Sequence, residues 1–172
     1  MKNVSECASR ARISGTIRGV VQTESVKQIQ LITDGACLGN PGPGGWAAIL
    51  RYGPNKKEVF GFERHTTNNR MELTAAIEGL RTLKEQCEVE VITDSEYLKN
   101  GITQWIAGWK KRNWMTSQKK PVINRDLWEA LDDEVARHKM KWSWTKGHAS
   151  HDDNNRADEL ASVAAREQRA SK

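Results

Sequence analysis

Four acidic residues stand at positions where carboxylates could do chemistry. Asp34 and Asp94 each follow an apolar stretch, in the similar segments L-I-T-D-G and V-I-T-D-S, and Glu72 and Asp158 lie in helix-like segments. Carboxylates that lie close together need a cation if all of them are to stay ionised. Oxygen ligands suit magnesium or manganese rather than zinc. Two such ions about 4 Å apart can clamp the attacking and leaving oxygens of a phosphodiester.

Histidine and cysteine residues do not complete a zinc site. His148 and His151 share one loop, but no cysteine or carboxylate near them in the sequence completes a credible ligand set. Cys7, Cys37 and Cys87 are an odd number and form no C-x-x-C pair. This pattern argues against a disulfide framework and is compatible with a reducing cytosol.

The first acid belongs to a strand-rich region. A strand is expected from Gln28, ending at Thr33-Asp34-Gly35, and a turn rich in glycine and proline follows it. Trp46–Tyr52 and Val59–Phe62 have the composition of two further strands, separated by a turn-forming segment. Three strands with short connections predict an antiparallel meander.

A helix is expected next, from a cap at Thr67 or Asn68 to about Gln86. One of its faces carries Glu72, Ala76, Gly79 and Leu83. Because this stripe is otherwise small and apolar, it should face the sheet. A carboxylate on such a face needs a partner, since an unpaired buried charge is very costly.

The strand that ends at Asp94 follows this helix. The connection from the meander is long enough for a crossover, so this strand and the first one can lie parallel and adjacent. Both aspartates would then emerge at the carboxyl edge, where open α/β sheets bind ligands. Taken singly, each acid could instead close a turn, favour a helix N-terminus or pair with arginine. The convergence of at least three of them favours a site.

The remaining elements complete one domain. Short helical segments occupy 95–125, and a helix capped by Asn124 is expected to run to about His138. A last strand spans Lys139–Thr145, and a final helix contains Asp158 in its first turns. No linker interrupts 28–170, whereas 1–27 has no aromatic residue and is expected to be a flexible extension rather than a transit peptide.

Composition and charge restrict the class of protein. The 172 residues include no apolar run near the roughly 18 residues of a membrane helix. Residues 1–27 hold five basic and two acidic side chains, a net +3, and residues 97–125 hold seven basic and none acidic, a net +7. The total is +5, so the rest carries −5. A basic block on an acidic domain indicates a polyanionic partner, the alternative being a solvated charged surface.

Six segments together resemble the bacterial type 1 ribonuclease H (RNase HI) family over about residues 27–165. They are T-D-G-A-C-L-G-N-P-G-P-G-G, T-T-N-N-R-M-E-L-T-A-A-I, T-D-S-E-Y-L, W-x-x-x-W-K-K-R-N-W, K-G-H-A and D-E-L-A. The resemblance implies an α/β ribonuclease H-like fold, with a five-stranded mixed sheet flanked by helices and a catalytic domain at 28–170. It also implies hydrolysis of the RNA strand of RNA–DNA hybrids, leaving 3′-hydroxyl and 5′-phosphate ends.

The resemblance further implies a cofactor, partners and a location. Two magnesium ions, for which manganese can substitute, would act with substrate bound. The protein would be a cytoplasmic monomer without an obligate protein partner or a membrane association. Primer removal and R-loop clearance are the implied cellular roles.

The resemblance also assigns roles to residues. The metal-binding and catalytic acids are Asp34, Glu72, Asp94 and Asp158, and His148 is the loop histidine suited to proton transfer or product release. Contacts to the RNA strand fall on Cys37, Asn40, Asn69 and Glu96. Contacts to the DNA strand fall on Thr67, Tyr97, Trp105, Trp109, Lys110, Lys111, Arg112 and Asn124, with Trp105 also a candidate for the core, and Asn68 is a nucleic-acid contact assigned to neither strand.

Two departures and two alternatives remain. Glu96 stands where glutamine is expected and Ser150 where glycine is expected, which puts cleavage preference and loop stiffness in doubt.

A catalytically silent hybrid-binding module is one alternative, but a pure binder needs no acidic cluster facing phosphate. A DNA-cutting relative of the same fold is the other, and the T-T-N-N-R-M-E-L and basic segments disfavour it.

Overall fold

The computed structural model describes residues 25–145 and 152–170. The strands are β1 (Gln28–Cys37), β2 (Gly42–Tyr52), β3 (Asn55–Thr66), β4 (Glu88–Thr93) and β5 (Lys139–Trp144). The helices are α1 (Asn68–Arg81), α2 (Glu96–Asn100), the π-helical turn η1 (Gly101–Trp105), α3 (Ile106–Lys111), α4 (Arg125–Val135) and α5 (Asp152–Ala170). Among the helices of these described ranges, none combines the length and apolar character needed to cross a membrane.

The strands form one five-stranded mixed sheet in the order β3-β2-β1-β4-β5. β1 pairs antiparallel with β2, and β2 with β3, whereas β1–β4 and β4–β5 are parallel. The predicted meander and the predicted crossover through α1 are therefore both confirmed. The fold class predicted from the sequence is confirmed as well.

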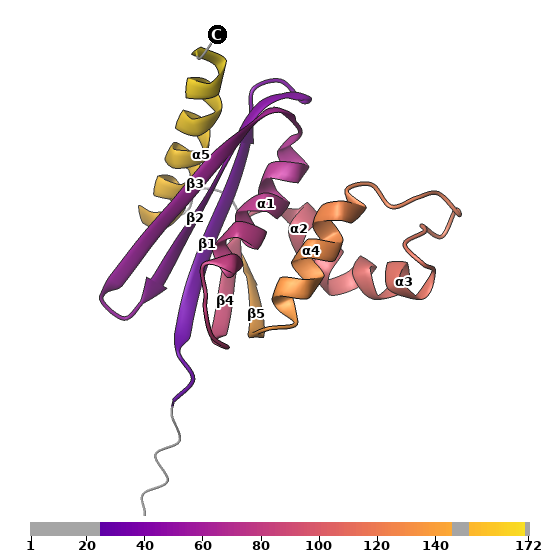
Figure 1. Cartoon of the computed structure of the whole chain (residues 1–172), viewed down its shortest axis with the longest axis horizontal. Coiled ribbons are helices and arrows are strands. Elements are labelled where there is room, and N and C mark those ends of the chain that lie inside the picture. The colour runs from indigo at the N-terminus through magenta and orange to yellow at the C-terminus, as the bar shows by residue number, and fades with distance from the viewer. Residues whose placement is uncertain (1–24, 146–151, 171–172) are drawn as a thin grey trace, which may run out of the picture.

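Helices cover both faces of the sheet (Figure 1), with α5 on one face and α1 and α4 on the other. Successive side chains of each strand point to opposite faces of the sheet, so one strand contributes apolar residues to the packing on both faces. On β1, Ile29 and Leu31 belong to the apolar cluster that includes α1 and α4. Ile32 belongs to the second cluster, which contains Ala161 of α5. The two clusters hold the helices that carry Glu72 and Asp158 against opposite faces of β1.

The prediction that β1 ends at Asp34 is wrong. Parallel pairing of β1 with β4 stops at the pair Ile32–Ile92, but antiparallel pairing with β2 continues to Cys37–Gly44. The sheet therefore opens between β1 and β4 just beyond Ile32. Asp34 lies at this opening, in a strand that is still anchored on its other side.

Two helices are shorter than predicted. α1 ends at Arg81 with Thr82 as its cap, and the Thr82 hydroxyl donates to the Gly79 carbonyl at 2.8 Å. α4 ends at Val135, because Ala136 caps it and the chain turns into β5 at Lys139. Neither change alters the face that each helix presents to the sheet.

Candidate active site

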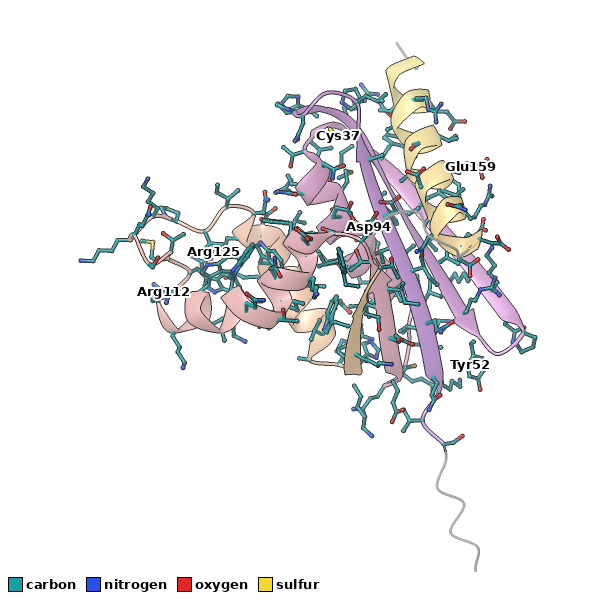
Figure 2. The ribbon with its side chains drawn as sticks, turned by 180° about the vertical axis from the view of Figure 1, so that it is seen from behind. Cys37, Tyr52, Asp94, Arg112, Arg125 and Glu159 are labelled. Atoms are coloured by element: carbon teal, nitrogen blue, oxygen red, sulfur yellow. The ribbon has the colours of Figure 1, made fainter. Side chains whose placement is uncertain are left out.

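Three carboxylates from three elements meet beside the opening in the sheet. Asp34 lies in β1, Asp94 directly follows β4, and Glu72 lies in the second turn of α1. One ligand oxygen from each carboxylate lies within 4.8 Å of the others. Figure 2 labels Asp94, which lies in the middle of the molecule between the helical layers. The predicted convergence of these three acids is what the structure shows.

Gly35 allows the first and second of these acids to approach. A Cβ added at Gly35 would lie 2.6 Å from the backbone nitrogen of Glu72 and 2.7 Å from the carbonyl carbon of Met71. These atoms belong to the backbone of α1 and cannot move without moving the helix. The absence of a side chain at Gly35 therefore sets how close Glu72 comes to Asp34.

Burial and mutual repulsion disfavour the charged forms of two acids. Burial raises the pKa of Asp34 to about 7, the charge of Asp94 adds to this rise, and the Gly35 N–H, 2.8 Å from Oδ1, partly offsets it. Glu72 is only 5% exposed, and burial followed by the charges of Asp34 and Asp94 raises its pKa well above the ordinary value. The ionised forms of these carboxyls are therefore costly in the folded protein unless a cation binds beside them.

The cluster fits a divalent cation of the magnesium type. The Oε2 atom of Glu72 is buried and has no hydrogen-bond partner among the described residues. A buried carboxylate oxygen without a donor is costly unless a ligand meets it. All of the available donor atoms are carboxylate oxygens, which magnesium and manganese prefer.

Asp158 approaches the cluster from α5. It is half-buried and lies close enough to Asp34 for its carboxyl to contribute to the raised Asp34 pKa. It is not one of the three acids whose oxygens lie within 4.8 Å of one another. The position of Asp158 depends on how the first turns of α5 are anchored.

Ion pairs anchor the start of α5 to the β2–β3 hairpin. Both oxygens of Asp153 accept from the guanidinium of Arg51, through Nε and, at 2.9 Å, through Nη2. Lys56 lies 3.2 Å from Oδ1, and the Asp153 side chain is only 12% exposed. The bond from Arg51 is the main reason that the pKa of Asp153 lies below its ordinary value. One turn later Arg156 donates to Glu58 of β3 at 3.1 Å.

We expect Asp153→Asn to loosen this anchor. The loss of a partly buried charged pair should lower the free energy of unfolding by roughly 1–2 kcal/mol at pH 7. Because the Asp153 pKa is depressed, its stabilisation is present above pH 3.8 and is lost as pH falls below that value. Thermal unfolding at pH 7 and pH 3 measures both effects. Glu159→Gln, at a 61% exposed partner of Arg156, is the matched control and should change little.

A hydrogen-bond network joins the starts of α1 and α4. Thr67 is the N-cap of α1 and accepts from the Arg70 N–H at 3.3 Å. The Arg70 guanidinium donates to Asn124 Oδ1 at 3.3 Å and to the Asp126 carboxylate at 3.1 and 2.8 Å. The Asn124 amide donates to the Tyr97 hydroxyl at 3.1 Å. Three residues predicted to contact DNA thus belong to one connected surface.

The prediction that Asn124 caps α4 is confirmed, because Asn124 occupies the N-cap position. It has left-handed backbone angles and forms no side-chain cap bond. Its amide is instead engaged by Arg70 and Tyr97. Arg70 was not singled out from the sequence, although it lies three residues after the Thr67 cap within the T-T-N-N-R segment. An arginine three residues after a helix N-cap could have indicated this role from the sequence.

Aromatic rings support the basic segment. The Trp109 ring centroid lies 5.8 Å from that of Trp105 and 5.4 Å from that of Trp128. Trp128 is fully buried, whereas Trp105 is 38% exposed, so Trp128 rather than Trp105 is the core tryptophan of this group. Lys110 pairs with Asp132 at 2.6 Å, while Lys111 is exposed. Figure 2 shows Arg112 on a projection that extends away from the sheet.

The residues predicted to contact RNA surround the glycine-rich turn and the starts of α1 and α2. The Asn40 side chain accepts from the backbone N–H of Asn68 at 3.2 Å, which ties the turn to α1. The Cys37 thiol lies 2.8 Å from the Gly39 carbonyl, and burial raises its pKa, so it is not a thiolate. Asn69 and Glu96 are exposed. His148 and Ser150 lie outside the described residues, as do residues 1–24.

Known proteins resemble this chain in sequence and in fold. The ribonuclease H family model matches residues 26–166. Ribonuclease H of Solibacter usitatus (strain Ellin6076) is 71% identical over 143 residues, or 83% of this chain and 98% of the relative. Ribonuclease HI of Neisseria meningitidis serogroup B (strain ATCC BAA-335 / MC58) is 58% identical over 137 residues, or 80% of this chain and 94% of the relative.

Two solved structures extend the comparison. LC9-RNase H1, a type 1 RNase H with the type 2 active-site motif, superposes with a TM-score of 0.75 at 32% identity, covering 83% of this chain and 74% of that one. LC11-RNase H1, solved in complex with an RNA/DNA hybrid, gives a TM-score of 0.60 at 24% identity, covering 81% and 97%. The second similarity concerns the fold alone.

The mixed sheet and the acidic cluster define an α/β nuclease domain whose site is compatible with divalent cations. The chain belongs to the ribonuclease H family, among the bacterial type 1 enzymes. The family and the enzyme class predicted from the sequence are thereby confirmed.

Proposed function

We propose that this chain is an endoribonuclease that hydrolyses the RNA strand of RNA–DNA hybrids and leaves 3′-hydroxyl and 5′-phosphate ends. The observation that carries the proposal is the cluster of Asp34, Glu72 and Asp94, with ligand oxygens within 4.8 Å. Ribonuclease H of Solibacter usitatus, at 71% identity, supports the activity. The hybrid bound to LC11-RNase H1 supports the substrate.

Asp34, Glu72, Asp94 and Asp158 are proposed to hold two magnesium ions when substrate is bound, with manganese as a substitute. Ions held there would supply positive charge that stabilises the attacking and the leaving oxygen of the phosphodiester. The protein holds the carboxylates at fixed positions on β1, α1, β4 and α5, so little reorganisation is needed. His148 is proposed to move a proton during attack or release.

Strand discrimination is proposed to come from two surfaces. The first joins the glycine-rich turn to the starts of α1 and α2, where Cys37, Asn40, Asn69 and Glu96 can contact the RNA strand and its 2′-hydroxyls. The second is the network of Thr67, Tyr97 and Asn124, continued by the tryptophans and basic residues around α3, for the DNA strand. Asn68, whose backbone N–H donates to Asn40, lies between the two surfaces. One surface would accept an RNA strand and the other a DNA strand. Double-stranded DNA, which has no 2′-hydroxyls, would then not be positioned at the carboxylates.

The other proposed attributes follow from the same residues. The four acids and both surfaces come from one chain, so catalysis requires no second subunit and no obligate partner. Cys37 and Cys87 are free thiols, which is compatible with the proposed cytoplasmic location. Primer removal and R-loop clearance are the cellular roles proposed for such an enzyme.

The proposal is tested with end-labelled RNA–DNA hybrid, double-stranded RNA and double-stranded DNA of one sequence, each with magnesium or with chelator. The expected result is cleavage of the hybrid alone, in its RNA strand, with 5′-phosphate ends, and none with chelator. Cleavage of double-stranded DNA at a comparable rate would support the DNA-cutting alternative. Tight hybrid binding without cleavage would support the silent binding module.

We expect neutralisation of the basic segment to weaken substrate binding and to spare chemistry. Lys110, Lys111 and Arg112 changed together to alanine should raise KM roughly tenfold at low salt, with kcat within about threefold, because these side chains lie away from the carboxylates. Because Lys110 is already paired with Asp132, the slope of log KM against log salt should fall by roughly two, about one each for Lys111 and Arg112.

The matched control for this prediction removes lysines from β5. Lys139 and Lys141 are exposed on β5, where they pair with Glu88 and Glu90, and neither belongs to the basic segment around α3. Their replacement by alanine should leave the salt slope of KM unchanged. An equal change in both variants would mean that net charge, rather than a local grip, governs binding.

A further inference from the structure

The backbone of Asp94 has no strand partner among the described residues. Pairing of β4 with β1 stops at Ile92, and pairing of β4 with β5 stops at Thr93. Asp34, by contrast, still pairs with β2, and Glu72 lies inside α1. The Asp94 side chain is also the exposed one of the three. Asp94 is therefore the acid of the cluster whose position the sheet and the helices determine least.

The side chain of Trp144 supplies the contact that a neighbouring strand would have made. Trp144 is the last residue of β5 and lies opposite Thr93. Its indole Nε1 donates a hydrogen bond to the main-chain carbonyl of Asp94 at 3.1 Å. Figure 1 shows β5 beside β4, so the contact spans the two strands where their ladder ends. This bond fixes the peptide that carries the carboxylate.

A second contact holds the indole in this orientation. The Nζ atom of Lys99 in α2 lies over the Trp144 ring, 5.2 Å from its centroid, in the geometry of a cation–π interaction. α2 follows Asp94 directly, with Ser95 as its N-cap. The Ser95 N–H donates to Oγ1 of Thr93 at 3.1 Å, which closes the turn around Asp94. The indole thus contacts both Asp94 and the helix that follows it.

Packing in the core does not account for Trp144. Trp142 lies two residues earlier on the same face of β5 and packs against the apolar cluster of α1 and α4. Trp144 lies at the end of the strand and is 36% exposed. The specific contact of its ring nitrogen is with the carbonyl of an acid in the proposed cation site.

We propose that Trp144 is a positioning residue, which holds Asp94 where a divalent cation can be bound. The inference rests on the proposed cation site and adds to it a residue that acts through Asp94. Without the indole N–H, the Asp94 peptide should adopt a wider range of orientations, so a cation should bind less tightly. Groups that orient metal ligands typically contribute roughly 10–100-fold to metal affinity or activity.

Two substitutions separate the ring nitrogen from the ring itself. Trp144→Phe keeps an aromatic ring beside Lys99 and loses the donor. Trp144→His loses the second ring but keeps a nitrogen, Nε2, at the same number of bonds from Cβ, which can donate to the Asp94 carbonyl. Trp144→Phe should raise the magnesium dissociation constant roughly tenfold, and Trp144→His should recover most of that loss. KM for the hybrid should stay within about twofold in both, because the proposed hybrid contacts lie on other residues.

Magnesium binding to the full chain is measured without substrate, at a pH of about 8, where the introduced histidine is neutral. Calorimetry gives the dissociation constant, and NMR follows the indole N–H signals. The Trp144 signal is the one that disappears in Trp144→Phe. In wild type this signal should shift on addition of magnesium, with a midpoint that matches the calorimetric dissociation constant. Thermal unfolding shows that each variant is folded.

Trp142→Phe is the matched control, since it makes the same chemical change in the core part of β5. It should lower Tm and leave the magnesium dissociation constant unchanged. The proposal is overturned if folded Trp144→Phe binds magnesium as tightly as wild type, if Trp142→Phe weakens binding equally, or if folded Trp144→His recovers nothing. An uncleaved hybrid would count against the proposed substrate and leave these readings valid, whereas a wild type that binds no magnesium would overturn both the cation site and this inference.

Discussion

Asp34→Asn is expected to lower kcat on RNA–DNA hybrid by roughly 10³-fold or more, because one corner of the proposed cation site loses its charge. The amide keeps the size of the carboxylate, so the fold and the substrate surfaces are retained. KM should change little, since the proposed hybrid contacts lie on other residues. Single-turnover cleavage with magnesium measures the loss. A variant that retains kcat within tenfold of wild type would contradict the assignment of Asp34.

The same change is expected to stabilise the protein when a chelator removes cations. Burial raises the pKa of Asp34 from 3.8 to about 7, so its ionised form is costly in the folded state. At pH 8 the variant should gain roughly 1–3 kcal/mol of unfolding free energy. For a domain of this size that corresponds to a rise in Tm of roughly 3–8 °C.

The sign of the pH dependence follows from the direction of the shift. At pH 8 Asp34 is charged in both states, and the wild type carries the full cost of that charge. As pH falls through 7, folded wild type takes up the proton before the unfolded chain does, and the cost is relieved until pH reaches about 3.8. The Tm advantage of Asp34→Asn should therefore be largest at pH 8 and should shrink toward pH 4.

Magnesium provides the complementary measurement. A cation that binds the folded state stabilises it, so magnesium should raise the Tm of wild type more than that of Asp34→Asn. Asp133→Asn is the matched control, since Asp133 is exposed on α4 and has no partner within the described residues. It should leave kcat, Tm and the magnesium response unchanged. Equal magnesium responses in all three proteins would place the cation elsewhere.

Gly35→Ala is the second change with a large expected effect. The new Cβ would lie 2.6 Å from the Glu72 nitrogen and 2.7 Å from the Met71 carbonyl carbon, so α1 must move away from β1. Overpacking of this kind costs roughly 1–3 kcal/mol of stability. A shift of about 1 Å at a catalytic group can cost roughly 10²-fold in rate. Both Tm and kcat should therefore fall, and the magnesium concentration for half-maximal activity should rise.

Gly53→Ala separates misplacement of the carboxylates from loss of stability. Gly53 has φ +53°, and a Cβ there would meet no atom within 4 Å. Alanine at this turn should cost roughly 1–2 kcal/mol through backbone strain alone. Its Tm should fall while kcat at 25 °C stays close to wild type. If Gly35→Ala showed the same pattern, the close approach of β1 and α1 would not control the site.

Much of the fold could be predicted because its signals are local. Alternation in Gln28–Cys37 and the small-residue stripe of α1 each specify an element and the face it buries, and Gly53-Pro54 specifies the turn between β2 and β3. The expected turn at 53–57 was too long, because β3 already begins at Asn55 and pairs there with Tyr52. The repeated T-D pair after two apolar strands, together with a crossover, then places Asp34 and Asp94 at one edge. Six segments, two of which contain these aspartates, carried the family resemblance.

Features that depend on pairing between distant segments could not be predicted. The end of β1 was misplaced because Asp34 loses its neighbour on the β4 side and keeps its neighbour on the β2 side. The contacts of the Asn124 side chain could not be predicted because Arg70 and Tyr97, which bond to its amide, are distant from it in the sequence. Trp105 was a candidate for the core, but Trp128 occupies the buried position beside Tyr97 and Trp109, and Trp105 is 38% exposed.

By itself the sequence determined which groups are available for chemistry, namely four carboxylates, a loop histidine and a basic aromatic segment, because these depend on residue type and order. Only the tertiary structure decided how strongly the acids interact. The opening between β1 and β4 and the contact of Gly35 with α1 bring Glu72 into a buried position beside two other charges. Burial and distance govern the cost of those charges, and both are properties of packing. The contact of Trp144 with the Asp94 carbonyl likewise depends on β5 lying beside β4.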